Sequence, residues 1–135
     1  MEGDDKVGVK EKATALHESG FNCAQSVLCA CGEYTGLDDK TALAVSGGFG
    51  GGVRCGEICG AISGAVMAVG MAYPYTDGSD SKAKALIAAK TCEVTKTYKE
   101  KYGCVRCAEL KGMGASCAEL IELGAETAEK IILNK

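Results

Sequence analysis

The sequence has one proline in 135 residues, one histidine and a formal net charge of only −3. Its basic residues alternate with acidic ones, so the chain lacks the concentrated positive charge of a nucleic-acid-binding protein. It also lacks an apolar run of the roughly 20 residues that a membrane span requires. We therefore exclude nucleic acid as a partner and expect no membrane insertion.

The amino terminus lacks the features of a secretory signal. MEGDDKVGVKEK is polar and acidic, whereas a signal peptide begins with basic residues and continues into an apolar stretch. We therefore expect a cytoplasmic protein. Persistent structural disulfides are rare in that reducing compartment, so clustered cysteines there favour metal ligation or thiol redox chemistry.

Cysteine is what the chain has in excess, with nine residues in total. Because the number is odd, complete intrachain pairing would leave one cysteine free, which argues against a secreted disulfide scaffold. Hydrophobic residues make up 47% of the chain, enough to bury a core without disulfides. We expect residues 1–135 to form a single domain.

The apolar residues recur at helical spacing, and no segment shows the sustained alternation of a β-strand. Asn22, Ser116 and either Ser79 or Ser81 are the expected helix N-caps. The predicted helices cover residues 6–19, 23–34, 38–45, 57–73, about 81–102 and 117–133. The predicted fold class is all-α, a small irregular helical bundle.

Two glycine-containing segments stand out. Five of the first seven residues of SGGFGGGVRCG, residues 46–56, are glycine, so this loop either lets the backbone approach a ligand or forms a tight helix crossing. No strand and no Gly-Lys-Ser/Thr accompany it, which makes a phosphate loop improbable. In the next segment, small residues on Gly60 to Met71 allow a close helix contact. We expect part of that surface to be shared in a homodimer.

The cysteines that carry information lie in four neighbourhoods: FNCAQSVL, RCGEICGAISG, YGCVRCAEL and SCAELIELG. Taken together, from about Phe21 to the final helix, they resemble the C_GCAxxG_C_C family. Residues 59–64 read CGAISG, with cysteine before glycine where the family's name has the reverse order. The resemblance implies a redox-active protein. By position, its four centre cysteines are Cys23, Cys59, Cys107 and Cys117, with Cys55 and Cys104 as additional candidates.

A similar domain accompanies haem in the split-Soret cytochromes, where a cysteine cluster looks suited to an iron–sulfur centre. Here Cys104 and Cys107 are followed by Ala108, and the one histidine is His17, so the covalent haem signature is missing. The resemblance therefore implies an iron–sulfur cluster rather than haem. By ligand type, four thiolates suit zinc equally well.

Cys23, Cys59 and Cys117 fall at predicted helix starts, where the positive end of the helix favours the thiolate over the thiol. Three functions stay open. The first is an iron–sulfur protein for electron transfer or redox sensing. The second is a metal-free thiol/disulfide oxidoreductase with Cys59 and Cys107 as catalytic residues. The third is a structural zinc site. Either redox function implies a redox partner protein. By contrast, the remaining cysteines lie in alanine-rich helices and are expected to serve packing: Cys29, Cys31 and Cys92.

Overall fold

The computed structural model describes residues 7–135 and confirms an all-α fold. Within this range there are helices and one isolated β-bridge, but no strand. The predicted first helical residue, Lys6, lies outside the described residues. The elements are α1 Val9–Glu18, α2 Cys23–Ala30, α3 Gly32–Thr35, α4 Asp39–Ser46, η2 Gly52–Gly56, α5 Gly60–Ala72, α6 Ser81–Tyr102, α7 Cys107–Gly112 and α8 Cys117–Leu133.

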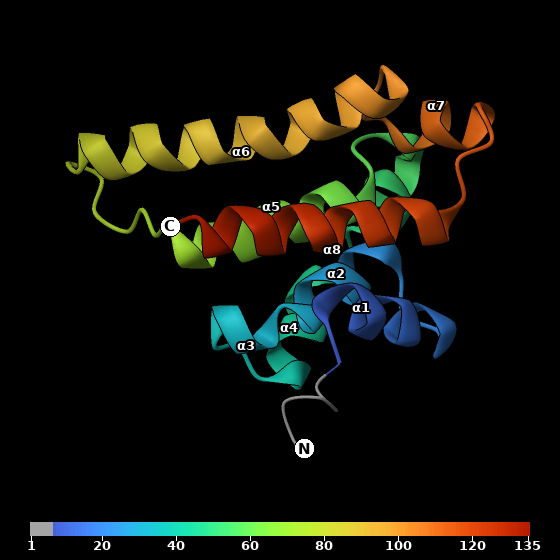
Figure 1. The fold of residues 1–135 in the computed structure, drawn as a ribbon, viewed down its shortest axis with the longest axis horizontal. Coiled ribbons are helices and arrows are strands. Elements are labelled where there is room, and N and C mark those ends of the chain that lie inside the picture. The colour runs from blue at the N-terminus through green and yellow to red at the C-terminus, as the bar shows by residue number, and fades with distance from the viewer. Residues whose placement is uncertain (1–6) are drawn as a thin grey trace.

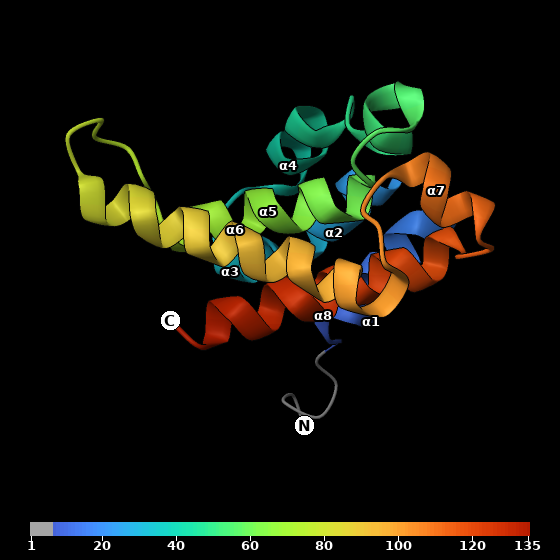
Figure 2. The same ribbon diagram turned by 90° about the horizontal axis from the view of Figure 1, so that it is seen from above.

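Helix α5 is the centre of the bundle. It packs against α2, α6 and α8, while α1 packs against α2 and α8. Helix α6 lies along one side of α5 and α8, and α1 to α4 lie on the other side (Figure 1). The two long helices α6 and α8 run in opposite directions in both views (Figures 1 and 2). Helices α5 and α8 both begin at the end of the bundle where α7 lies.

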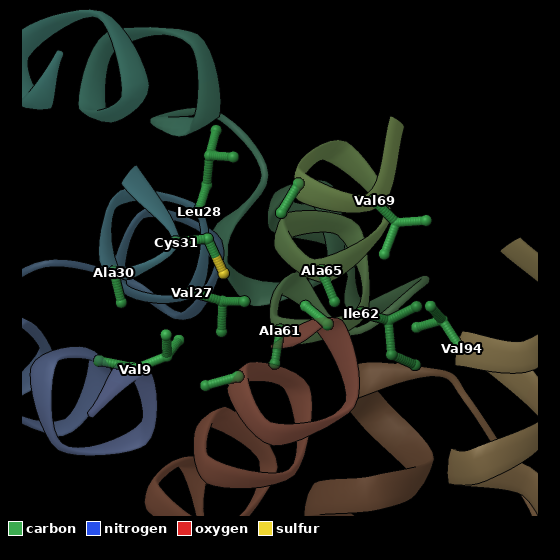
Figure 3. Close-up of a cluster of buried hydrophobic side chains, with 14 of the residues drawn as sticks. Val9, Val27, Leu28, Ala30, Cys31, Ala61, Ile62, Ala65, Val69 and Val94 are labelled. Carbon is green, nitrogen blue, oxygen red and sulfur yellow. The ribbon is translucent and has the colours of Figure 1, made fainter. Parts of the chain in front are cut away.

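The small residues of α5 permit the close helix contact that the sequence predicted. A Cβ atom on Gly64 would lie 2.7 Å from the Ala24 carbonyl oxygen of α2. On the other side of α5, a Cβ atom on Gly124 of α8 would lie 3.0 Å from the Ala61 carbonyl oxygen. The side chains of α2 and α5 that fill the core include Val27 and Ala65, as the close-up in Figure 3 shows.

Two predicted helices and one predicted N-cap were wrong. The helix expected over residues 23–34 is two helices, because the backbone leaves the helical path at Cys31 and α3 begins at Gly32. The central helix begins at Gly60 instead of Glu57, because the residues before it form the β-bridge between Ile58 and Arg106. The N-cap of α6 is Asp80, whose carboxylate accepts a 3.0 Å hydrogen bond from the Ala83 backbone N–H.

The chain itself covers most of the small-residue surface of the central helix, which the sequence offered for a homodimer. The chain itself buries the following residues of α5: Gly60, Ala61, Ile62, Gly64, Ala65, Ala68, Val69 and Ala72. Met71 alone among its large side chains is largely exposed. On α6, Val94 and Tyr98 are buried, whereas Leu86 is exposed. None of the helices in residues 7–135 combines the length and hydrophobicity that a membrane span needs.

Candidate functional site

Cys23 and Cys117 occupy equivalent positions in two helices. Each is the first residue of its helix and lies inside a capping box, in which the N-cap side chain and the residue three positions later exchange hydrogen bonds with each other's backbone. The sequences are NCAQ in α2 and SCAE in α8. The caps fix both helix starts, and with them the positions of the two cysteines.

Cys59 and Cys107 are placed by the β-bridge. The Cys59 N–H donates to the Val105 carbonyl at 2.9 Å, and the Cys107 N–H donates to the Glu57 carbonyl at 2.6 Å. Arg106 adds two hydrogen bonds to the Glu57 carboxylate, at 3.2 and 3.3 Å. Cys59 is thereby the N-cap of α5 and Cys107 the first residue of α7.

The four cysteines named from the sequence lie together. A Cβ atom on Gly60 would be 3.2 Å from the Cβ of Cys23, so the start of α5 lies directly against the start of α2. Cys117 lies close enough to Cys23 to contribute to the raised pKa of the Cys23 thiol. Cys59 is within electrostatic reach of Cys23, Cys107 and Cys117. A single centre built from four helix starts is therefore compatible with the structure.

Burial controls the protonation of this centre. It raises the pKa of the Cys23 thiol to about 12, with further contributions from Cys117 and Cys59, and Lys111 acts weakly in the opposite direction. Burial likewise raises the pKa of Cys59, although the backbone N–H groups of Ala61 and Ile62 favour its thiolate. At Cys59 the backbone N–H groups at the start of α5 act as the sequence predicted, but desolvation outweighs them, and the Cys23 and Cys59 thiols keep their protons.

Whether the centre can hold a metal ion depends on the chemistry and the arrangement of its side chains. The donor chemistry suits iron–sulfur clusters and zinc, since both bind cysteine thiolates. Over residues 7–135, however, no three or more His, Cys, Asp or Glu side chains are arranged so that they could hold a metal ion. The described geometry therefore supports no mechanistic step through a metal.

The glycine-rich loop lines the site next to Cys107. Four consecutive residues have a left-handed backbone, and two of them are not glycine: Val53 has φ 57° and Arg54 has φ 62°. A Cβ atom on Gly52 would lie 2.9 Å from the Cβ of Cys107 and 2.5 Å from the backbone of Glu57. The absence of a side chain at Gly52 therefore lets this strained turn lie against the cysteine centre.

The other cysteines differ in their surroundings. Cys29 and Cys31 are buried, as predicted, whereas the expectation that Cys92 packs in the core was wrong, because α6 exposes it to solvent. Cys55 is exposed, and its thiol donates to the Gly52 carbonyl at 3.5 Å. Cys104 is half-buried, 3.8 Å from the Met113 sulfur. The assignment of Cys55 and Cys104 as additional site residues stays a prediction.

Sequence reasoning missed two groups beside the centre. Tyr98 of α6 lies within electrostatic reach of Cys59 and Cys23, and Lys111 of α7 lies within reach of Cys23. The repetition of Cys-Ala-Glu/Gln at residues 23, 107 and 117 was a visible signal that these helix starts are alike. The position of Tyr98 had no such signal, because helical spacing alone indicated only a buried aromatic residue.

The fold and the site define a class: a small all-α domain in which four cysteines at helix starts gather at one end of the bundle. The family model described as "Putative redox-active protein (C_GCAxxG_C_C)" matches residues 21–131, and the chain belongs to this family. No curated protein and no solved structure matches the chain. The family match confirms the resemblance seen in the cysteine motifs.

Proposed function

We propose that Cys23 and Cys117 are the working pair of a redox centre and that they cycle between a dithiol and a disulfide. The observation that carries this proposal is the proximity of the two thiols, since Cys117 contributes to the raised pKa of Cys23. Both residues are half-buried, so a partner can reach them. Cys59 and Cys107 are only 1% and 8% exposed.

The reaction is thiol–disulfide exchange with a disulfide-bearing partner. Because the raised pKa of Cys23 disfavours its thiolate, we assign the first attack to Cys117. Cys117 bonds to one partner sulfur and releases the other as a thiol. Cys23 then loses its proton, attacks the Cys117 sulfur and releases the second partner thiol. The protein's two thiols are oxidised to one disulfide, the partner's disulfide is reduced to two thiols, and both protons pass to the partner.

Cys59 and Cys107, the catalytic pair expected from the sequence, remain a prediction. They lie within electrostatic reach of each other beneath the outer pair. Their burial favours a supporting role, in which they surround Cys23 and Cys117 rather than meet the partner. A reducing compartment such as the cytoplasm would keep all four in the thiol form between reactions.

The second candidate is a metal–thiolate centre, with an iron–sulfur cluster for electron transfer or redox sensing and zinc as its non-redox counterpart. The convergence of four thiols supports it. Metal binding displaces the protons of cysteine ligands, and so relieves the cost of ionising thiols that burial holds in the neutral form. Side chains of this centre would have to rearrange to surround a metal.

A single preparation of the protein distinguishes the disulfide-cycling function from the metal–thiolate centre. The full-length protein is isolated anaerobically and analysed for metal and acid-labile sulfide. It is then equilibrated in glutathione redox buffers, trapped by alkylation and mapped by peptide mass spectrometry. We expect a Cys23–Cys117 disulfide that forms reversibly.

The variants Cys23→Ser and Cys117→Ser should abolish this disulfide, whereas Cys92→Ser, at an exposed cysteine of α6, should leave it unchanged. Iron and sulfide in stoichiometric amounts would favour the cluster instead. Absence of the Cys23–Cys117 peptide at every glutathione ratio would show that the disulfide proposal is wrong.

A further inference from the structure

Cys104 and Met113 form a pair of sulfur atoms apart from the Cys23–Cys117 pair. The Cys104 thiol donates to the Met113 thioether, and the two sulfur atoms are 3.8 Å apart. At this separation the sulfurs are in direct contact, with no other atom between them. Met113 is 55% exposed and Cys104 is half-buried. A small molecule from solvent can therefore reach the pair.

The short helix α7 holds the two sulfurs together. Cys104 lies between α6 and α7, directly after Gly103, whose left-handed φ of 79° ends α6. Met113 is the C-cap of α7, and its backbone N–H donates to the Glu109 carbonyl at 3.1 Å. Leu110 of α7 is fully buried and anchors the helix at one end of the bundle (Figure 1). The residue before the helix and the residue after it are thus fixed in contact.

The two side chains carry complementary redox chemistry. Peroxides oxidise an exposed thioether to a sulfoxide, and a thiol can be oxidised in turn to a sulfenic acid. Transfer of oxygen from a sulfoxide to a thiol requires that the two sulfurs meet, and here they already do. Holding the reacting groups together raises their effective concentration. Met71 lacks this arrangement: it is 46% exposed, but the described residues that line its groove include no cysteine.

We propose that Met113 and Cys104 form a peroxide-reducing pair. The Met113 sulfur takes one oxygen atom from hydrogen peroxide, the O–O bond breaks, and water leaves. The Cys104 thiol then accepts that oxygen. The sulfoxide S–O bond breaks, an S–O bond forms on Cys104, and the thiol proton ends on the oxygen of the resulting sulfenic acid. Met113 is thereby reduced to the thioether while Cys104 is oxidised.

A low-molecular-weight thiol such as glutathione completes the cycle. Its sulfur attacks the Cys104 sulfenic acid and releases water, which leaves a mixed disulfide. A second molecule of the same thiol attacks that disulfide, so Cys104 leaves as a thiol and the two small thiols become one disulfide. One peroxide and two thiols are converted to one disulfide and two water molecules. The activity is independent of the proposed Cys23–Cys117 disulfide, because it uses neither of those sulfurs.

The test follows the Met113 sulfoxide in the full-length protein by peptide mass spectrometry. The reduced protein is treated with hydrogen peroxide, catalase removes the excess, and glutathione is then added. The Met113 sulfoxide should decay in the wild type and persist in Cys104→Ser, with a difference of at least about tenfold after a fixed time. The Met71 sulfoxide should persist in both proteins. Cys92→Ser, at an exposed cysteine of α6, should behave as the wild type.

A second measurement needs no substitution. Wild-type protein is alkylated with iodoacetamide in its native, reduced form before the peroxide is added. The alkylated Cys104 has no thiol, so this sample should retain the Met113 sulfoxide after glutathione is supplied.

Each outcome bears on a stated claim. A Met113 sulfoxide that persists in the wild type overturns the inference. Equal decay in the wild type, Cys104→Ser and the alkylated protein also overturns it, because glutathione would then act without Cys104. Decay that depends on Cys104 supports the inference even in a protein that forms no Cys23–Cys117 disulfide, a result that would remove only the proposed exchange reaction.

Discussion

At the scale of single residues, burial sets the state of the thiols. Cys31 lies among the aliphatic side chains between α2 and α5 (Figure 3) and is fully buried. Burial raises its pKa to about 12, and Glu129 and Glu33 add to the shift. The neutral thiol therefore behaves as a small apolar side chain, which explains why an alanine-rich helix accommodates it.

The raised pKa of Cys31 predicts a loss of stability at alkaline pH. An unfolded cysteine ionises near 9.0, whereas the folded one holds its proton to about 12. The contribution to stability is therefore complete below about pH 9 and is lost progressively as the pH rises toward 12. Urea unfolding at several pH values between these limits should show a free energy of unfolding that falls by at most about 1.4 kcal/mol per pH unit for this group.

Cys31→Ala should make that decline shallower, while Cys92→Ala should keep it, because Cys92 is exposed. Cys23 and Cys29 also have raised pKa values, so some decline should persist in Cys31→Ala. Equal slopes in wild type and Cys31→Ala would show that the buried thiol does not contribute.

At the scale of helices, the contact between α2 and α5 depends on one missing side chain. A Cβ atom on Gly64 would lie 2.7 Å from the Ala24 carbonyl oxygen, a distance that requires the backbones to separate. Gly70, further along α5, has no atom within 4 Å of the corresponding position. The same helix thus contains a glycine required by packing and one that is not.

Gly64→Ala should destabilise the protein by about 1–3 kcal/mol, the usual cost of overpacking a core. Gly70→Ala should stabilise it by up to about 1 kcal/mol, because alanine is the better helix former. Denaturant unfolding of the two variants provides the comparison. A stabilised Gly64→Ala protein would contradict the close approach of α2 and α5.

The left-handed turn beside Cys107 leads to a second prediction at the scale of helices and turns. Val53 has φ 57°, a conformation that is costly for a β-branched residue by about 1–2 kcal/mol. Val53→Gly should therefore stabilise the protein by about 0.5–1 kcal/mol, after allowance for the greater entropy of the unfolded glycine chain. Val45→Gly, at a similarly exposed position in α4, should destabilise it. Thermal unfolding of both variants measures the difference.

At the scale of the whole molecule, the described residues form an apolar groove on the surface. It has a volume of about 300 Å³ and lies between α4 and α5. Its lining residues are Leu28, Leu37, Thr41, Val45, Met67, Gly70 and Met71. Since the chain covers most of α5 itself, this groove is the part of the predicted shared surface that is still open.

The homodimer stays a prediction, now confined to this groove. If two copies meet there, Met71→Glu should yield monomers in light scattering at micromolar concentration, because it would bury a charge in the interface. Leu86→Glu on α6 is the matched control, since both side chains are 46% exposed and Leu86 lies outside the groove. A monomeric wild-type protein at that concentration would show that the homodimer prediction is wrong.

The sequence by itself determined most of the helices and singled out four cysteines as candidates for one centre. Helix signals act over only a few positions, so they can be recognised in the sequence. Examples are the capping residues Asn22 and Ser116 and the apolar residues at helical spacing. The family motifs singled out Cys23, Cys59, Cys107 and Cys117 for the same reason, because each belongs to a short local pattern. The misplaced start of α5 shows the limit of such patterns, since it depends on a bridge to residues far along the chain.

Only the tertiary structure decided which sulfurs meet and in what state. The contact of Cys23 with Cys117 joins helices that are distant in sequence, and no local pattern encodes it. Burial then reverses the thiolate preference expected at a helix start, because desolvation acts through every element packed around the thiol.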